Sequence, residues 1–66
     1  MPIIQVQILK GRSNEQIKSL IADLTDAAVK NLTVQPEQVR VLLTEIEESH
    51  WGAGGLTMDE IKNRRN

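Results

Sequence analysis

The residues of this chain that could do chemistry are a proline at position 2 and two arginines. Small second residues favour removal of the initiator methionine, and Pro2 would then carry a secondary amine on a rigid ring. A free α-amine titrates near ~8, and partial burial or nearby positive charge lowers its pKa, because each disfavours the ammonium form. A general base works best when its pKa lies near the operating pH. Pro2 could therefore act as a base beside an apolar wall and cations. The alternative is that it merely begins an edge strand, where a missing N–H is harmless.

The candidate cations are Arg12 and Arg40. Arg12 follows the first apolar run of the chain, and Arg40 lies among valine and leucine side chains. A guanidinium group binds a carboxylate in bidentate fashion, so two arginines would suit a dicarboxylate. They would also lower the pKa of Pro2. The alternative is that both are surface charges, which is the usual place of arginine.

The chain has one aromatic residue, Trp51, in the glycine-rich stretch 49–55. Trp51 could supply an apolar wall beside the amine, or it could anchor a subunit interface. The two roles are compatible if sites form at interfaces. His50 has no partner at a recognisable spacing and is expected at a surface or an interface. The remaining acidic candidates are expected to be solvated charges: Glu45, Glu47 and Glu48.

The elements that would position these residues begin with a strand over Ile3–Leu9, where apolar residues alternate with glutamines. Ser13 and Gln16 form a predicted capping box at the start of a helix. The helix presents one apolar stripe at the spacing of a helical face: Ile17, Leu20, Ile21, Leu24, Ala28 and Leu32. It is expected to end at Thr33–Pro36, because the residue before a proline is disfavoured in the α region.

A second strand is predicted over Val39–Ile46, one helix after the first. This order predicts an α/β (α+β) fold built on a single β-α-β unit, with parallel strands and a right-handed crossover. The tail, Met58–Asn66, is expected to add a short strand or hairpin and a helical turn. Residues 1–66 are expected to form one domain.

The composition predicts an oligomer. A chain of 66 residues buries only about 60% of the surface that its unfolded form exposes. It has no cysteine for a disulfide, and a structural zinc site is not expected with a single histidine. Assembly with other copies is the remaining way to add a core. The net charge of −1 does not favour a nucleic-acid or membrane partner. With no signal-peptide pattern and no apolar run of about 20 residues, a cytoplasmic location is expected.

The length of the first strand separates Pro2 from Arg12. Seven residues at about 3.3 Å each place Arg12 some ~25 Å or more from the Pro2 of its own chain. Arg40 is expected nearer to Pro2, because parallel strands start at the same end of a sheet. An antiparallel pairing of two chains would bring the end of one first strand beside the start of the other. If these residues cooperate, the site is therefore shared between subunits.

Four motifs in order resemble one family over the span from Pro2 to about Gly55. They are P-I-I-Q-V-Q-I-L, K-G-R-S-N-E-Q, V-R-V-L-L-T-E and H-W-G-A-G-G. Together they are similar to the 4-oxalocrotonate tautomerases, also called 2-hydroxymuconate tautomerases, of the tautomerase superfamily. Each motif alone is weak, and the order and spacing of all four carry the resemblance.

The resemblance implies a fold, an assembly and a reaction. The fold is a β-α-β unit with a C-terminal hairpin, assembled as a homohexamer that is a trimer of dimers. Pro2 would be the base that moves a proton from the hydroxyl of a 2-hydroxydienoate to a distant carbon, without any cofactor or metal. The family's role suggests the degradation of aromatic compounds. Arg12 would bind the remote carboxylate, Arg40 would hold the 2-oxo end, Leu9 would line the site, and Trp51 stands where the family usually has phenylalanine.

Three alternatives to this reaction stay open. Related members of the superfamily are hydratases or dehalogenases that use a carboxylate in the C-terminal loop and often an arginine on the first strand. Ala53 and Leu9 occupy those places here, which disfavours that chemistry. A phenylpyruvate-type keto-enol tautomerase is a second alternative. The third is an oligomeric binding module without catalysis, which would leave the match of the Met-Pro start to the other motifs as a coincidence.

Overall fold

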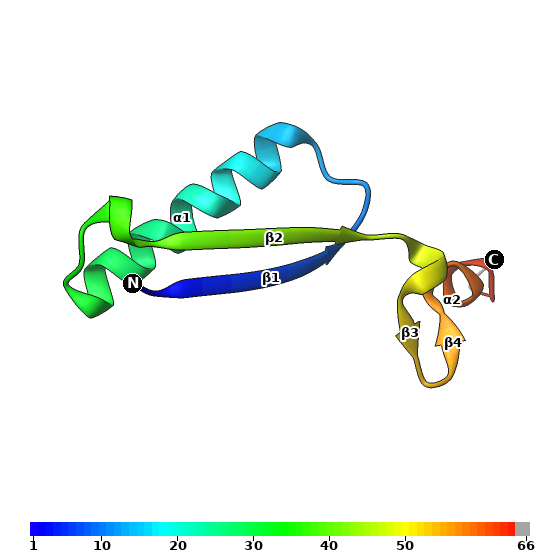
Figure 1. Cartoon of the computed structure of the whole chain (residues 1–66). Helices are drawn as coiled ribbons and strands as arrows, with labels where there is room; N and C mark the ends of the chain where they lie inside the picture. Colours follow the sequence, from blue (N-terminus) through cyan, green and yellow to red (C-terminus); the bar gives the residue numbers. More distant parts are fainter. Residues whose placement is uncertain (65–66) are drawn as a thin grey trace.

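The structure of the protein is a computed structural model, and it describes residues 1–64. The last two positions of the predicted tail lie outside the described residues. A strand, a long helix and a second strand are followed by a small C-terminal unit (Figure 1). The elements are β1 (Ile3–Leu9), α1 (Asn14–Leu32), the 3₁₀ helix η1 (Pro36–Gln38), β2 (Arg40–Ile46), the 3₁₀ helix η2 (Glu48–His50), β3 (Gly52–Ala53), β4 (Leu56–Thr57) and α2 (Met58–Arg64).

The two long strands are parallel neighbours, which confirms the predicted β-α-β unit. Their register runs from Ile3 opposite Arg40 to Leu9 opposite Ile46. β1 has the predicted bounds, whereas β2 begins at Arg40, one residue later than expected. The reason is that the N–H of Val39 donates to the carbonyl oxygen of Pro36 over 3.1 Å and so closes the turn of η1.

Helix α1 begins and ends where the sequence predicts. The hydroxyl of Ser13 accepts from the N–H of Gln16 over 3.2 Å, and the Gln16 side chain accepts from the N–H of Ser13 over 3.1 Å. These two bonds are the predicted capping box. At the other end, Thr33 adopts a left-handed conformation with φ of 53° and donates to the carbonyl oxygen of Val29. That conformation satisfies one terminal carbonyl and stops the helix.

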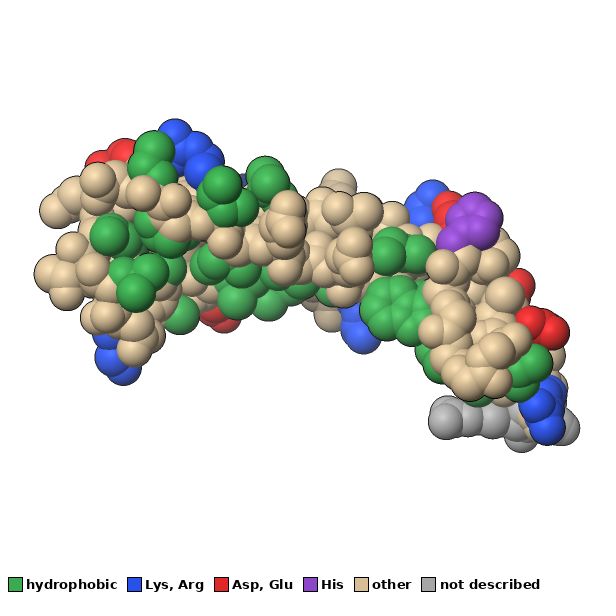
Figure 2. All heavy atoms as spheres, turned by 60° about the horizontal axis from the view of Figure 1, so that its bottom comes forward, with side chains coloured by type: hydrophobic (Ala, Val, Ile, Leu, Met, Phe, Trp, Pro, Cys, Tyr) green, Lys and Arg blue, Asp and Glu red, His purple; other side chains and the backbone are tan. Residues whose placement is uncertain are grey.

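The helix covers one face of the two-stranded sheet and leaves the other face open. Alternate residues of the strands, such as Ile4, Val6 and Leu43, are half-buried on the helix side. On the other side the side chains are exposed, with Ile3 at 63% and Leu42 at 52%. Figure 2 brings the underside of Figure 1 forward and shows hydrophobic side chains exposed over this part of the molecule.

The protomer has a very small core. Ala28 and Val39 are the only buried hydrophobic residues within positions 1–64. The chain measures 46 × 24 × 15 Å, and its radius of gyration is 15.4 Å. A compact chain of this length would have a radius of gyration of about 11 Å. The excess arises because the unit from η2 to α2 extends beyond the end of β2 (Figure 1). Within the described residues, no helix is long and apolar enough to cross a membrane.

Candidate active site

One end of the sheet brings together Pro2 and Arg40. The N–H of Arg40 donates to the carbonyl oxygen of Pro2 over 3.0 Å, so the predicted base and one predicted cation are joined through the backbone. The Arg40 guanidinium donates to the carbonyl oxygen of Glu37 and, over 3.5 Å, to that of Val39. These bonds anchor the cation at the entry to β2. Pro2 itself is half-buried.

The other end of the sheet carries Leu9 and Arg12. Gly11 has a φ of 129°, a conformation that side-chain-bearing residues rarely adopt, and it turns the chain from β1 toward α1. Leu9 and Arg12 then line one hollow of about 320 Å³, together with Lys10, Gln16, Glu48 and Lys62. The structure therefore places two predicted binding residues together, at the opposite end of β1 from Pro2.

Two ion pairs involve residues that line the same hollow as Arg12. The ammonium group of Lys10 lies 2.9 Å from the carboxylate of Glu47. Their hydrogen bond, reinforced by the opposite charges, raises the pKa of Lys10 and lowers the pKa of Glu47. Lys62 forms an ion pair with Glu48. Within residues 1–64 Arg12 has no such ion-pair partner.

Trp51 lies in a different hollow. It lines a groove of about 610 Å³ together with glutamine, leucine and threonine residues of β1 and β2, among them Gln5, Leu42 and Thr44. Trp51 is half-buried, and its carbonyl oxygen accepts from the N–H of Met58 over 2.8 Å. Within one protomer, Trp51 therefore faces the sheet and does not line the hollow that holds Arg12.

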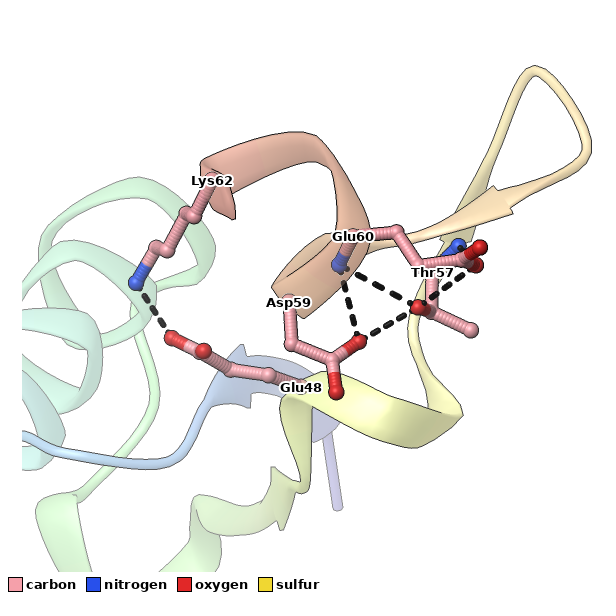
Figure 3. Close-up of polar contacts among 5 residues, drawn as sticks. All are labelled: Glu48, Thr57, Asp59, Glu60 and Lys62. Atoms are coloured by element: carbon pink, nitrogen blue, oxygen red, sulfur yellow. Dashed lines mark hydrogen bonds and ion pairs between the residues drawn. The ribbon is translucent and has the colours of Figure 1, made fainter. Parts of the chain in front are cut away.

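The sequence did not single out Lys62, and it led to a wrong expectation for Glu48. Glu48 is half-buried and paired with Lys62, instead of being a solvated charge, because η2 turns its side chain toward α2 (Figure 3). Glu47 and His50 are exposed, as expected. One signal for α2 was present in the tail. Thr57 and Glu60 have the spacing of a capping box, and the N–H of Thr57 donates to the Glu60 carboxylate over 2.9 Å.

The comparison with known proteins settles the family. The profile of the family described as tautomerase enzyme matches residues 2–60. The chain belongs to the tautomerase family. It is an enzyme of the isomerase class, and the predicted resemblance to the 4-oxalocrotonate tautomerases is confirmed. The matched span includes the predicted site residues at both ends of the sheet and stops before Lys62.

Individual relatives agree with this assignment. The tautomerase is 47% identical over 55 residues to the 2-hydroxymuconate tautomerase of Pseudomonas fluorescens, covering 83% of this chain and 87% of that one. The crystal structure of TomN, a 4-oxalocrotonate tautomerase homologue in the tomaymycin biosynthetic pathway, superposes with a TM-score of 0.95. Its sequence is 34% identical, and the match covers 98% of this chain and 100% of TomN. A heterohexamer 4-oxalocrotonate tautomerase from Chloroflexus aurantiacus has a TM-score of 0.87 at 34% identity, covering 92% of this chain and 98% of its own. The predicted fold class is thereby confirmed.

Proposed function

We propose that this tautomerase converts a 2-hydroxydienoate such as 2-hydroxymuconate into the conjugated 2-oxo acid. The observation that supports this proposal most is the placement of Pro2 with Arg40 at one end of the sheet and of Leu9 with Arg12 at the other. The base and the two carboxylate-binding groups are thus presented at strand ends, where a second copy can complete a site. The 47% identity to an enzyme named 2-hydroxymuconate tautomerase points to the same substrate class.

The proposed reaction moves one proton and needs no cofactor. The Pro2 amine, free after removal of Met1, takes the proton of the C2 hydroxyl as the C2–O bond becomes a carbonyl. The diene electrons shift along the chain, and the same amine delivers the proton to the far carbon of the diene. Arg40 stabilises the negative charge that develops on the C2 oxygen. Arg12 binds the remote carboxylate through the two parallel hydrogen bonds that a guanidinium group can donate to it.

The apolar residues of the site keep the Pro2 amine neutral. Leu9 and Trp51 would exclude water from the amine, and desolvation disfavours the ammonium form. Trp51 of one protomer faces the open side of its own sheet. It would therefore reach the reacting amine only across a subunit boundary.

The proposed assembly is a homohexamer, a trimer of dimers, with each site shared between subunits. Pro2 and Arg12 lie beyond opposite ends of a strand of seven residues, a separation of about 25 Å at the usual rise per residue. One chain cannot bring both to a single substrate. The exposed apolar face of the sheet, with Ile3 and Leu42, supplies the surface that such an assembly would bury. A relative named as a heterohexamer supports an assembly of six chains.

The test of this function combines an intact mass with an assay of 2-hydroxymuconate ketonisation on the same sample. Met1 is 77% exposed in the protomer, and the small Pro2 after it favours its removal. We expect a mass without methionine together with turnover, and we expect N-acylation of Pro2 to abolish that turnover. Retained methionine with full activity would contradict the mechanism, because the Pro2 nitrogen would then be a tertiary amide without basicity. Turnover of 3-haloacrylates faster than of any enol would favour the dehalogenase alternative.

A further inference from the structure

Three segments far apart in the sequence meet around the guanidinium of Arg12. Leu9 ends β1 and Arg12 follows it in the connection to α1, Glu48 comes from η2, and Lys62 comes from α2. All of them line the hollow of about 320 Å³ at the end of β1. Lys62 lies beyond the span that the tautomerase profile matches. The charges around Arg12 are therefore set in part by a residue that the family profile does not describe.

The hollow carries an excess of positive charge. Its lining includes three cations, Lys10, Arg12 and Lys62, and the single carboxylate of Glu48. Lys10 is neutralised from outside by Glu47, 2.9 Å away. Glu48 neutralises one more charge through its ion pair with Lys62. Among the described residues that line the hollow, the charge of Arg12 is the one outside these two ion pairs, and it matches the charge of one carboxylate.

The ammonium group of Lys62 is held by Glu48 and keeps N–H donors that this ion pair does not use. Its side chain reaches from α2 to Glu48, as Figure 3 shows, and the side chains of Lys62 and Glu48 are 57% and 32% exposed. The start of α2 is fixed by Thr57, whose N–H and hydroxyl both donate to the Glu60 carboxylate over 2.9 Å. An ammonium group has three N–H donors. Glu48 accepts one of them, so the others remain for a ligand that enters the hollow beside Arg12.

We propose that Lys62 is a second cation for the remote carboxylate of the substrate, positioned by Glu48, and that it makes this tautomerase selective for dicarboxylates. The proposal rests on the proposed function, because it assigns to Arg12 the carboxylate farthest from the reacting hydroxyl. Arg12 would supply a planar fork, and Lys62 a point charge at the rim of the same hollow. Neither residue would touch the 2-oxo end of the substrate.

The test compares two substrates in the assembled enzyme. One is 2-hydroxymuconate, and the other is the dienol monoacid 2-hydroxypenta-2,4-dienoate, which lacks the remote carboxylate. For Lys62→Met we expect KM for the dicarboxylate to rise about five-fold to ten-fold, the range of a partly exposed charge-assisted contact, with kcat within about two-fold of wild type. KM for the monoacid should not change. Lys62→Arg keeps the charge and should keep KM for the dicarboxylate within about two-fold of wild type.

The matched control is Lys18→Met, which removes the same charge from the exposed face of α1. It should leave KM unchanged for both substrates. Lys62→Gln keeps a polar side chain and gives the same test if the methionine variant changes the assembly seen by size-exclusion chromatography. An unchanged KM in the Lys62 variants, or an equal rise for both substrates, would overturn the proposal. A wild-type enzyme that turns over neither substrate would instead overturn the proposed function.

Discussion

The N–H of Arg40 donates to the carbonyl oxygen of Pro2 over 3.0 Å, and this bond joins the start of β2 to the residue before β1. The parallel register therefore fixes the predicted base and one predicted cation at the same end of the sheet. The Arg40 side chain is also bonded to the carbonyl oxygens of Glu37 and Val39, which holds its guanidinium near the start of β2. Preorganised donors are effective at stabilising developing charge, because they need no reorientation during the reaction.

The two arginines should show different kinetic defects. Arg40→Gln should lower kcat for 2-hydroxymuconate by about 100-fold, the usual loss when a donor to a developing oxyanion is removed. Arg12→Gln should mainly raise KM, by about ten-fold or more, because it loses a charge-assisted contact to an unreacting carboxylate. Steady-state kinetics of both variants give this comparison. The reverse pattern, with KM altered by Arg40 and kcat by Arg12, would exchange the two roles.

Mixed assemblies should recover activity that neither parent has. Pro2 and Arg12 lie at opposite ends of β1, so a shared site would take them from different chains. We expect Pro2→Ala and Arg12→Glu proteins to be nearly inactive alone, and to regain a substantial fraction of wild-type activity after joint unfolding and refolding. The measurement is the specific activity of the mixture against the sum of the two parents. Activity equal to that sum would mean that each site lies within one chain.

The main elements follow from local sequence signals. The alternation of apolar and polar residues in Ile3–Leu9 predicts β1, and the cap at Ser13 predicts the start of α1. Both signals depend on neighbouring residues alone. The exposed Leu32, at 57%, departs from the predicted apolar stripe. It lies at the end of α1, where the helix extends past the sheet that would cover it (Figure 1).

The charge pattern around Arg12 could not be predicted in the same way. The pairing of Glu48 with Lys62 depends on how the β3–β4 hairpin returns α2 toward η2, over a separation of 14 residues. No periodicity in the sequence encodes that turn. Positive φ values at Gly54 and Gly55, of 63° and 87°, set the hairpin that brings α2 back toward η2. The glycines predict a turn, but they do not predict that α2 packs back against η2.

Assembly should depend on the open face of the sheet. Leu42 is 52% exposed in the protomer and lies on that face. Leu42→Asp should shift the protein from the oligomer to smaller species and lower its Tm, because each chain loses about 2 kcal/mol of apolar burial and gains a charge at the interface. Native mass spectrometry and thermal unfolding measure these effects. Lys18→Asp on α1 is the control and should keep the wild-type assembly, and an unchanged oligomer in Leu42→Asp would exclude this face from the interface.

The hydroxyl of Thr57 should stabilise α2. Its single O–H proton is shared between the carboxylates of Asp59 and Glu60, and its oxygen accepts from the N–H of Glu60 over 3.4 Å. Thr57→Val keeps the shape of the side chain and removes these bonds, which should cost about 1 kcal/mol of helix stability. Amide hydrogen exchange in α2 should then be several-fold faster, with exchange in α1 unchanged. Equal exchange in the variant and the wild type would show that the backbone alone holds α2.

Acid should loosen α2 in the wild type more than in Thr57→Val. The hydrogen bond from the Thr57 hydroxyl is the main reason that the pKa of Asp59 is lowered. Hydrogen bonds from the backbone N–H and the hydroxyl of Thr57 also lower the pKa of Glu60. A carboxyl whose pKa is lower in the folded state adds stability above its unfolded pKa of about 4, and this stability is lost as the pH falls through the folded value.

The helical Cα chemical shifts of α2 should therefore be constant from about pH 7 to pH 5 and should decline below about pH 4. In Thr57→Val the decline should be smaller, because the pKa values of Asp59 and Glu60 then lie closer to those of the unfolded chain. An equal decline in both proteins would assign the acid response to carboxylates other than Asp59 and Glu60.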